Sequence, residues 1–206
     1  SDKKMEELQL KYGLVRENDS KILSDKVQNG LPLSVDLKGE DGVLGFKAKK
    51  HSKLIDCDKP GNYPSDLFWE KITNQDIIMS NDKKNRSLVL SPDAFYILSS
   101  KEYVSVPPNL AAEMRPYDTK VGAFRAHYAG FFDPGFGLSE LNAAKTKAVL
   151  EVRSHDVPFL IEDGQTICRL IYEPMAKPPR ELYGQREGKN NYQSQGLKLS
   201  KHFVQI

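Results

Sequence analysis

The sequence has few cysteines, no long hydrophobic run and none of the common nucleotide or nucleophile motifs. Its two cysteines, Cys57 and Cys168, form no CxxC motif and no Cys/His cluster. A disulfide between them is one interpretation, but we favour two reduced, buried thiols in a cytoplasmic protein. No stretch approaches the ~20 apolar residues of a membrane span, so no membrane partner is expected. GxSxG, Walker A and GxGxxG motifs are missing, which removes the usual signatures of serine hydrolases and phosphate-binding loops.

An excess of one charge is also lacking, because 30 Lys and Arg residues are balanced by 28 Asp and Glu residues, giving a net charge of +2. Global charge therefore does not indicate a nucleic-acid partner. The four histidines have neither HxH nor HxxxH spacing, so no metal site is expected. The charged start, Ser-Asp-Lys-Lys-Met, lacks the apolar core of a signal peptide. Since the first residue is not methionine, we expect a processed product, a tagged chain or a piece of a longer protein.

What the sequence does contain is a series of short apolar or alternating runs, separated by Gly, Pro, Asn and Asp. Residues 2–12 differ, because Met5, Leu8 and Tyr12 share one helical stripe and Gly13 is the expected stop. Residues 110–114 hint at a further helical turn. The other runs predict strands, at 31–37, 42–48, 53–57, 75–80, 87–92, 94–100, 102–107, 122–129, 148–154, 157–161 and 166–174.

Strands and helices do not alternate along the chain, so a mainly β fold such as a β-barrel or jelly roll is predicted rather than a parallel α/β sheet. We divide the chain into an N-terminal helix and connector (1–30), a β domain (31–175) and a C-terminal tail (176–206). Residues 80–87 are expected to form an exposed hairpin tip, and residues 137–147 an inserted loop. The tail, rich in Pro, Gly, Asn, Gln and Lys, is either disordered or ordered by a ligand or a neighbouring subunit.

Glu151 stands in the alternating run Ala-Val-Leu-Glu-Val. With a period of two, Val149, Glu151 and Arg153 share one face of a strand, and residues 148, 150 and 152 share the other. Two interpretations are open. Most strand glutamates face solvent and pair with a nearby lysine or arginine. A glutamate inside a cleft would instead have a raised pKa and could act as a general base.

Asp133 lies in the segment Phe-Phe-Asp-Pro-Gly-Phe-Gly. Asp-Pro-Gly is an ordinary turn sequence, so a structural turn is the default interpretation. The neighbouring Phe131, Phe132 and Phe136 fit either the core or a wall that stacks on a flat heterocycle.

Three basic residues, Arg115, Lys120 and Arg125, lie within eleven residues. They either bind phosphates or form a solvated basic face. The tail segment 182–203 carries tyrosines, lysines and amides, which suits a lid that closes over a polar, phosphorylated ligand. Polar tails are common, so this segment alone does not indicate a ligand.

Taken together, four segments resemble the bacterial dCTP deaminase family of the trimeric dUTPase-like superfamily. Residues 102–137 are similar to the family's run from V-P-x-x-L-A-A to A-G-x-x-D-P-G-[FW], and residues 148–152 to the strand with its catalytic glutamate. Residues 157–175 and 182–203 resemble its L-x-P-G-x-x-I segment and its nucleotide-closing tail. The whole chain is still more similar to the second half of a long tandem form with two fused β domains, in which residues 1–30 would link the two.

The resemblance implies a dUTPase-like distorted jelly roll or β-barrel with a short N-terminal helix and an extended C-terminal tail. It implies zinc-independent, hydrolytic deamination of dCTP to dUTP and ammonia, as part of pyrimidine deoxynucleotide synthesis in the cytoplasm. No protein-bound cofactor is implied, and Mg²⁺ would arrive with the nucleotide triphosphate. The nucleotide partners would be dCTP, dUTP and dTTP.

Residue by residue, the resemblance implies that Glu151 activates water and shuttles protons, while the backbone carbonyl of Ala129 orients that water. Lys120 stands where the family has a catalytic arginine. The residues that it implies for substrate binding belong to the DPGF turn, the phosphate-binding turn or the tail: Arg115, Asp133, Tyr183, Lys189, Tyr192 and Gln195.

The phosphate-binding turn departs from the family, because Arg-Pro-Tyr-Asp-Thr-Lys replaces an Arg-Ser-Ser turn followed by arginine. Pro116 has no backbone N–H, neither Pro116 nor Tyr117 has a serine hydroxyl, and lysine does not replace arginine at a bidentate site. We therefore expect a homo-oligomer or a pseudo-trimer in which a related β domain supplies the serine turn.

Three functions stay open at this point. The first is a dCTP deaminase, the second a dUTPase or a bifunctional deaminase-pyrophosphatase, and the third a non-catalytic half-domain that completes a pseudo-trimer. Without the resemblance, the alternative would be a β-sandwich binding module.

Overall fold

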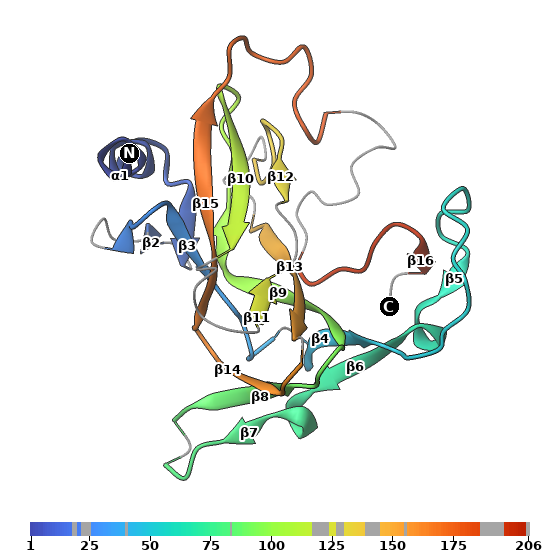
Figure 1. Cartoon of the computed structure of the whole chain (residues 1–206). Coiled ribbons are helices and arrows are strands. Elements are labelled where there is room, and N and C mark those ends of the chain that lie inside the picture. Colours follow the sequence, from blue (N-terminus) through green and yellow to red (C-terminus); the bar gives the residue numbers. More distant parts are fainter. Residues whose placement is uncertain are drawn as a thin grey trace.

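The fold is mainly β, as predicted, and a helix lies at the N-terminus (Figure 1). The structure is a computed structural model. It describes residues 1–17, 20–21, 26–39, 41–82, 84–116, 124–126, 130–138, 145–154, 156–185 and 196–204. The elements are α1 (Asp2–Tyr12), β1 (Val15–Glu17), β2 (Ser20–Lys21), β3 (Leu31–Ser34), β4 (Val43–Ala48), β5 (Tyr63–Pro64), η2 (Ser65–Leu67), β6 (Trp69–Thr73), η3 (Asn74–Asp76), β7 (Ile78–Met79), β8 (Arg86–Leu90), β9 (Phe95–Val104), β10 (Leu110–Pro116), β11 (Phe124–Ala126), β12 (Phe131–Phe132), β13 (Lys147–Ser154), β14 (Phe159–Glu162), β15 (Thr166–Pro174) and β16 (Phe203–Val204).

The strands form four sheets. The largest has seven strands and contains the run β11-β13-β9-β1-β2, with β4 paired to both β9 and β6. A four-stranded sheet, β12-β10-β15-β3, and a three-stranded sheet, β14-β8-β7, are both antiparallel. The small sheet of β16 and β5 is parallel. Figure 1 shows the chain after β15, in orange and red, passing over one end of the molecule before β16 pairs beside β5.

Helix α1 begins and ends where the sequence predicts. Its C-cap, Gly13, adopts the left-handed conformation with φ 61°, which glycine adopts without the steric cost of a Cβ. Met5 is buried in the core. The buried side chain of Gln9 donates to the carbonyl of Val15 at 2.6 Å and accepts from its N–H at 3.1 Å. These two bonds fix the helix against the start of β1.

The alternation predicted for β13 is confirmed. Ala148, Leu150 and Val152 are at most 1% exposed and belong to the main hydrophobic core. The opposite face carries Val149 and Glu151, which are only half-buried. Because successive side chains of a strand point to opposite faces, the burial of the first three fixes the direction of Glu151.

Several sequence predictions were wrong in detail. Residues 110–114 lie in strand β10, not in a helical turn, because β10 pairs with β15 along its whole length and this pairing outweighs local preference. Residues 53–57 form no strand and are exposed, in the turquoise loop beside β5 in Figure 1. Residues 94–107 contain a single long strand instead of two. Both cysteines are free, but Cys57 is exposed, and only Cys168 is buried as expected.

Other predictions hold or lie outside the described residues. The hairpin tip at 80–87 connects β7 to β8 and is closed by a backbone hydrogen bond from Ser80 to Asn85 at 3.0 Å. Within the predicted strand 122–129, residues 124–126 form β11, and the rest lies outside the described part of the chain. Most of the predicted loop 137–147 also lies outside it. The division into three segments stays a prediction.

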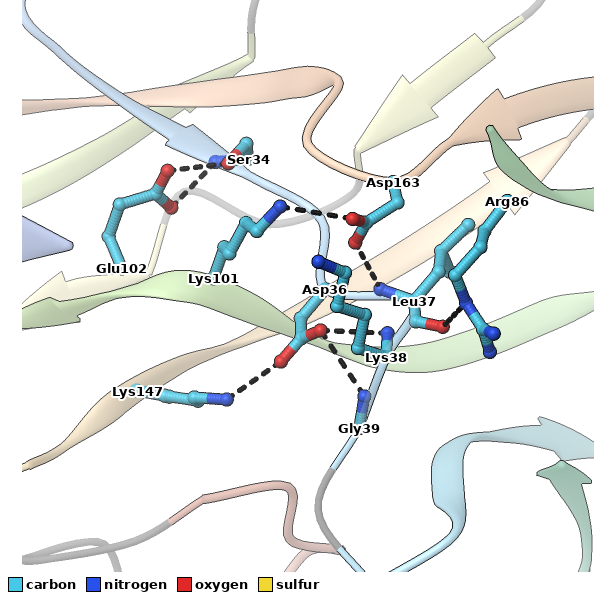
Figure 2. A network of polar contacts seen from close by, with 10 residues as sticks. All are labelled: Ser34, Asp36, Leu37, Lys38, Gly39, Arg86, Lys101, Glu102, Lys147 and Asp163. Atoms are coloured by element: carbon cyan, nitrogen blue, oxygen red, sulfur yellow. Dashed lines mark hydrogen bonds and ion pairs between the residues drawn. The ribbon is translucent and has the colours of Figure 1, made fainter. Parts of the chain in front are cut away.

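A buried ion pair lies where β3 leads toward β4 (Figure 2). The ammonium of Lys147 donates to Asp36 at 2.8 Å, and the two side chains are 7% and 8% exposed. Asp36 also accepts from the N–H groups of Lys38 and Gly39, at 2.8 and 3.2 Å. These bonds and the ammonium hold the pKa of Asp36 below its usual range, although burial alone would raise it. The pair ties the start of β13 to the end of β3.

A second buried carboxyl, Glu102 on β9, has no basic partner among the contacts of Figure 2. It accepts from the N–H of Ser34 at 2.8 Å and from the hydroxyl of Ser34 at 2.5 Å. Burial raises the pKa of Glu102, and the two bonds from Ser34 offset this only in part. The carboxyl therefore links β9 to β3 through neutral donors.

The Asp133–Phe136 segment forms the predicted turn. The N–H of Phe136 donates to the carbonyl of Asp133 at 3.1 Å, and Gly135 has φ 101°. Gly135 also touches the tail, because a Cβ at this position would lie 2.8 Å from the Cβ of Leu182 and from the N and O atoms of Tyr183. Only glycine allows the tail to approach the turn this closely.

Glu102→Gln should make stability less dependent on pH. A carboxyl whose pKa is raised by folding stabilises the protein fully below the unfolded-state pKa of about 4.3, and this contribution is lost as pH rises through the folded value. The unfolding free energy of the variant minus that of the wild type, measured by urea unfolding, should therefore be larger at pH 7.5 than at pH 4.5. Glu70→Gln, on the exposed side of β6, is the control. An equal difference at both pH values would contradict the prediction.

Gly135→Ala should displace the tail at Leu182 and Tyr183. The added methyl group overlaps both residues, so we expect a loss of about 1–3 kcal/mol in unfolding free energy and faster proteolysis of residues 176–185. Gly42→Ala is the matched control, because Gly42 also has positive φ (79°) but open space around its Cβ position. Equal effects of both variants would show that backbone strain alone matters.

Candidate active site

A cavity of about 500 Å³ lies over the face of the large sheet that carries Glu151. This volume is in the range of small-molecule sites, roughly 300–1,000 Å³. Its lining comes from the loop before β5, from β6, β9 and β13, from β12 with the residues on either side of it, and from two parts of the tail. The lining residues are Ile55, Trp69, Phe95, Ile97, Gly130, Phe131, Phe132, Asp133, Phe136, Val149, Glu151, Tyr183, Lys198, Ser200 and Phe203. Aromatic rings therefore surround a small number of polar groups.

Glu151 is the central acid of this cavity. The register places it directly opposite Ile97 of β9, which in turn lies opposite Phe46 of β4. Its carboxyl is half-buried among apolar neighbours, and this burial raises its pKa. A carboxyl whose pKa moves toward neutrality can both accept and return a proton. The cleft interpretation of Glu151 therefore replaces the solvent-facing one.

Asp133, in the turn after β12, and Tyr183, in the tail, line the same cavity as Glu151. The N–H of Tyr183 donates to the carbonyl of Pro134 at 2.8 Å, which attaches the tail to the turn. The rings of Tyr183 and Phe136 have centroids 5.7 Å apart, and those of Phe136 and Phe132 4.9 Å apart. Phe136 is thus both part of the core and part of the cavity wall.

Another part of the cavity wall, around Trp69, was not predicted from the sequence. Trp69 of β6 contacts Phe203 with ring centroids 5.6 Å apart and Phe95 at 6.1 Å. The indole Nε1 of Trp69 is buried with no hydrogen-bond partner within the described residues. Lys198 and Ser200 of the tail complete this side. The alternation Leu-Lys-Leu-Ser at 197–200 was a usable signal, but no local pattern shows which sheet face it covers.

Arg115, another predicted site residue, does not line this cavity. Arg115 lies at the exposed end of β10 and is paired with Glu113, Nη2 to Oε2 at 2.9 Å and Nε to Oε2 at 3.0 Å. The remaining predicted residues lie outside the described part of the chain: Lys120, Ala129, Lys189, Tyr192 and Gln195.

Within the ranges that the structure describes, no three His, Cys, Asp or Glu side chains cluster in a way that could hold a metal ion. No helix found there combines the length and the apolar character needed to cross a membrane.

Comparison with known proteins gives consistent matches. The family model for the C-terminal domain of 2'-deoxycytidine 5'-triphosphate deaminase matches residues 1–203. A dUMP-forming dCTP deaminase of Methanobrevibacter smithii is 27% identical over 183 residues, covering 86% of this chain and 84% of the relative. The corresponding protein of Methanosphaera stadtmanae is 26% identical over 191 residues, covering 89% and 87%.

Among solved structures, the crystal structure of 2'-deoxycytidine 5'-triphosphate deaminase from Agrobacterium tumefaciens is similar, with a TM-score of 0.70 and 43% identity. The match covers 87% of this chain but 49% of that chain, so the present chain spans about half of its length. The resemblance inferred from the DPGF turn, the AVLEV strand and the tail is therefore confirmed. The chain belongs to the dCTP deaminase family, as a representative of its C-terminal domain.

Proposed function

We propose that the protein catalyses the hydrolytic deamination of dCTP, with Glu151 as general base and general acid and without zinc. Family membership and the names of the relatives support dCTP as the substrate. The observation that carries the proposal is the half-buried Glu151 in the lining of an aromatic-walled cavity. Aromatic walls suit a flat pyrimidine ring, and the carboxyl is the polar group that its amidine edge requires.

The reaction needs two proton transfers, and one carboxylate can perform both. Water adds to C4 of cytosine while Glu151 takes one of its protons and delivers it to N3. Glu151 then takes the proton of the new hydroxyl on C4 and gives it to the amino group. The C4–N bond breaks with its electron pair on nitrogen, so dCTP and water yield dUTP and ammonia. General acid–base help of this kind contributes about 10²–10⁴-fold in rate.

The remaining roles follow the family resemblance. Ala129 would orient the attacking water through its carbonyl, and Asp133 would shape the cavity beside the sugar. The tail residues Tyr183, Lys189, Tyr192 and Gln195 would close over sugar and phosphates, with Mg²⁺ bound to the nucleotide. The attachment of Tyr183 to the DPGF turn supports a tail that lies at the cavity.

A second β domain is part of the proposal. Arg115 is exposed, bound to Glu113 and absent from the cavity lining, so within the described residues it does not reach the Glu151 site. We infer that Arg115 and Lys120 act at a site shared with a neighbouring subunit or related β domain, in a homo-oligomer or pseudo-trimer. The rival in which this chain is a non-catalytic half-domain differs in one respect, because Glu151 would then have no part in turnover.

Glu151→Gln should abolish deamination of dCTP while leaving the fold and nucleotide binding nearly intact. The amide keeps the shape of the side chain but cannot take a proton from water, so we expect a loss of about 10²-fold or more in kcat. Ammonia release, thermal unfolding and binding of Mg·dCTP measure the three properties separately. Glu173→Gln, on the exposed end of β15, should retain full activity. Normal turnover by Glu151→Gln would disprove the assignment.

The apparent pKa of the acidic limb in the pH profile of kcat/KM should lie above the usual pKa range of a glutamate. Burial raises the pKa of Glu151, and only the ionised carboxylate can accept the proton of water. Activity should therefore fall as pH decreases through this raised pKa. The profile is measured by ammonia release between pH 4.5 and 9. A limb at or below the ordinary value of about 4.3 would contradict the role of a desolvated Glu151.

A combined deaminase and pyrophosphatase is the second candidate, because the two curated relatives compared above are named dUMP-forming. Product analysis separates the two functions. We expect ammonia and dUTP in equal amounts from a deaminase alone. Release of dUMP, pyrophosphate and ammonia in equal amounts would instead indicate the combined activity.

A further inference from the structure

The indole N–H of Trp69 is a buried donor without an acceptor. Trp69 is partly buried on β6, and its Nε1 has no hydrogen-bond partner among the described residues. An unpaired buried donor costs free energy, so such a group in a native structure requires an explanation. The Nε of Arg16 is also buried and unpaired, but Arg16 does not line the cavity. Of these two donors, only that of Trp69 belongs to a residue of the candidate active site.

Trp69 and Glu151 project from the same face of the large sheet. Glu151 is paired with Ile97, and Ile97 with Phe46. Phe46 is paired in turn with Lys71, which follows Trp69 by two positions on β6. Paired residues of an antiparallel sheet, and residues two apart on one strand, share a face. The register therefore explains why Trp69 and Glu151 line one cavity.

Two aromatic neighbours hold the indole ring of Trp69. Its centroid lies 5.6 Å from that of Phe203, with the planes at 84°, and 6.1 Å from that of Phe95, with the planes at 50°. The ring also packs against the hydrophobic cluster that contains Phe46 and Phe68. This packing restricts the ring before a ligand arrives, which lowers the entropic cost of a contact with it.

The chemistry of the indole limits what it can bind. An indole N–H only donates, so its partner must be an acceptor. The rings in contact with it are apolar, and a charged phosphate oxygen beside them would lose hydration, whereas a neutral oxygen loses far less. In deoxycytidine, N3 and the amino group belong to the edge that Glu151 is proposed to meet. Two neutral acceptors lie elsewhere on this nucleoside, the O2 carbonyl of the base and the 3′-hydroxyl of the sugar.

We propose that Trp69 binds the nucleoside, and that its N–H donates to a neutral oxygen, either O2 of the base or the 3′-hydroxyl of the sugar. The identity of the nucleoside rests on the proposed function. Because Nε1 is closed to water in the free chain, the aromatic wall must shift when the nucleotide enters. The fluorescence of Trp69 should therefore change on binding.

Replacing the N–H alone tests the proposal. The chain contains one tryptophan, so a tryptophan analogue enters at position 69 only. Benzothienylalanine has sulfur in place of the N–H and keeps the double ring, whereas 5-fluorotryptophan keeps the N–H and controls for the incorporation. Trp69→Phe removes the donor by ordinary mutagenesis. Phe68→Leu is the packing control, because Phe68 belongs to the same cluster but does not line the cavity.

Calorimetry measures the binding of three triphosphates with Mg²⁺, in a Glu151→Gln background that prevents turnover. They are dCTP, its 3′-deoxy analogue, and the triphosphate of a 2-aminopyridine C-nucleoside, which keeps the N3 and amino edge but lacks the 2-carbonyl. The benzothienyl protein and Trp69→Phe should bind dCTP about 3–10-fold more weakly, the range of one neutral hydrogen bond. Unchanged affinity for the aminopyridine compound would identify O2 as the acceptor, and unchanged affinity for the 3′-deoxy compound the 3′-hydroxyl.

The thermal midpoint of the free benzothienyl protein should not fall, because the replacement removes an unpaired donor. The proposal is overturned if this midpoint falls, since the N–H then has a partner inside the protein. It is also overturned if the affinities for all three triphosphates change equally, if none changes, or if Phe68→Leu gives the same pattern. A chain that shows the expected pattern but releases no ammonia with Glu151 intact would refute the proposed function and leave the contact of Trp69 standing.

Discussion

The antiparallel pairing of β9 with β13 is the constraint on which the candidate site depends. One face of β13 buries Ala148, Leu150 and Val152 in the main core. A slip of one residue in this register would bring Glu151 into the core and the leucine out to the cavity. Burial of a charged carboxyl without a partner costs several kcal/mol, so the core side chains effectively hold Glu151 on the cavity side.

The same pair of strands also carries several buried polar groups. Their register shifts between Lys147 and Val149, and at this irregularity the hydroxyl of Ser100 accepts from the N–H of Ala148 at 2.9 Å and donates to the carbonyl of Glu102 at 2.7 Å. Lys147, beside this shift, pairs with Asp36. One strand thereby carries a structural ion pair at its start and the candidate reactive acid near its middle.

The sequence predicted those elements of the fold that are determined by a local pattern of residues. The stripe of Met5, Leu8 and Tyr12 with Gly13 predicted α1 with its correct ends, and the period of two predicted the two faces of β13. Residues 110–114 misled, because Leu, Ala, Glu and Met favour a helix locally, whereas the strand that they form exists through pairing with β15.

The candidate site was predictable only where a family motif covered it. Glu151, Asp133 and Tyr183 were named from the sequence and do line one cavity. Trp69 and Lys198 were not named from the sequence. Their positions depend on contacts between β6, the tail residues 196–204 and a sheet face, which are far apart along the chain. Tertiary packing of this kind leaves no periodic signal in any single segment.

Two glutamates with raised pKa differ in position: one carboxyl lies within the core, and the other lines a cavity. Burial raises the pKa of both Glu102 and Glu151. Glu102 already accepts two hydrogen bonds from Ser34 within the core, so its oxygens are occupied and a ligand has no path to them. Glu151 lines a cavity of about 500 Å³. The carboxyl of Glu102 links two strands through its hydrogen bonds from Ser34, whereas the raised pKa of Glu151, beside a cavity, is the property on which its proposed role in proton transfer depends.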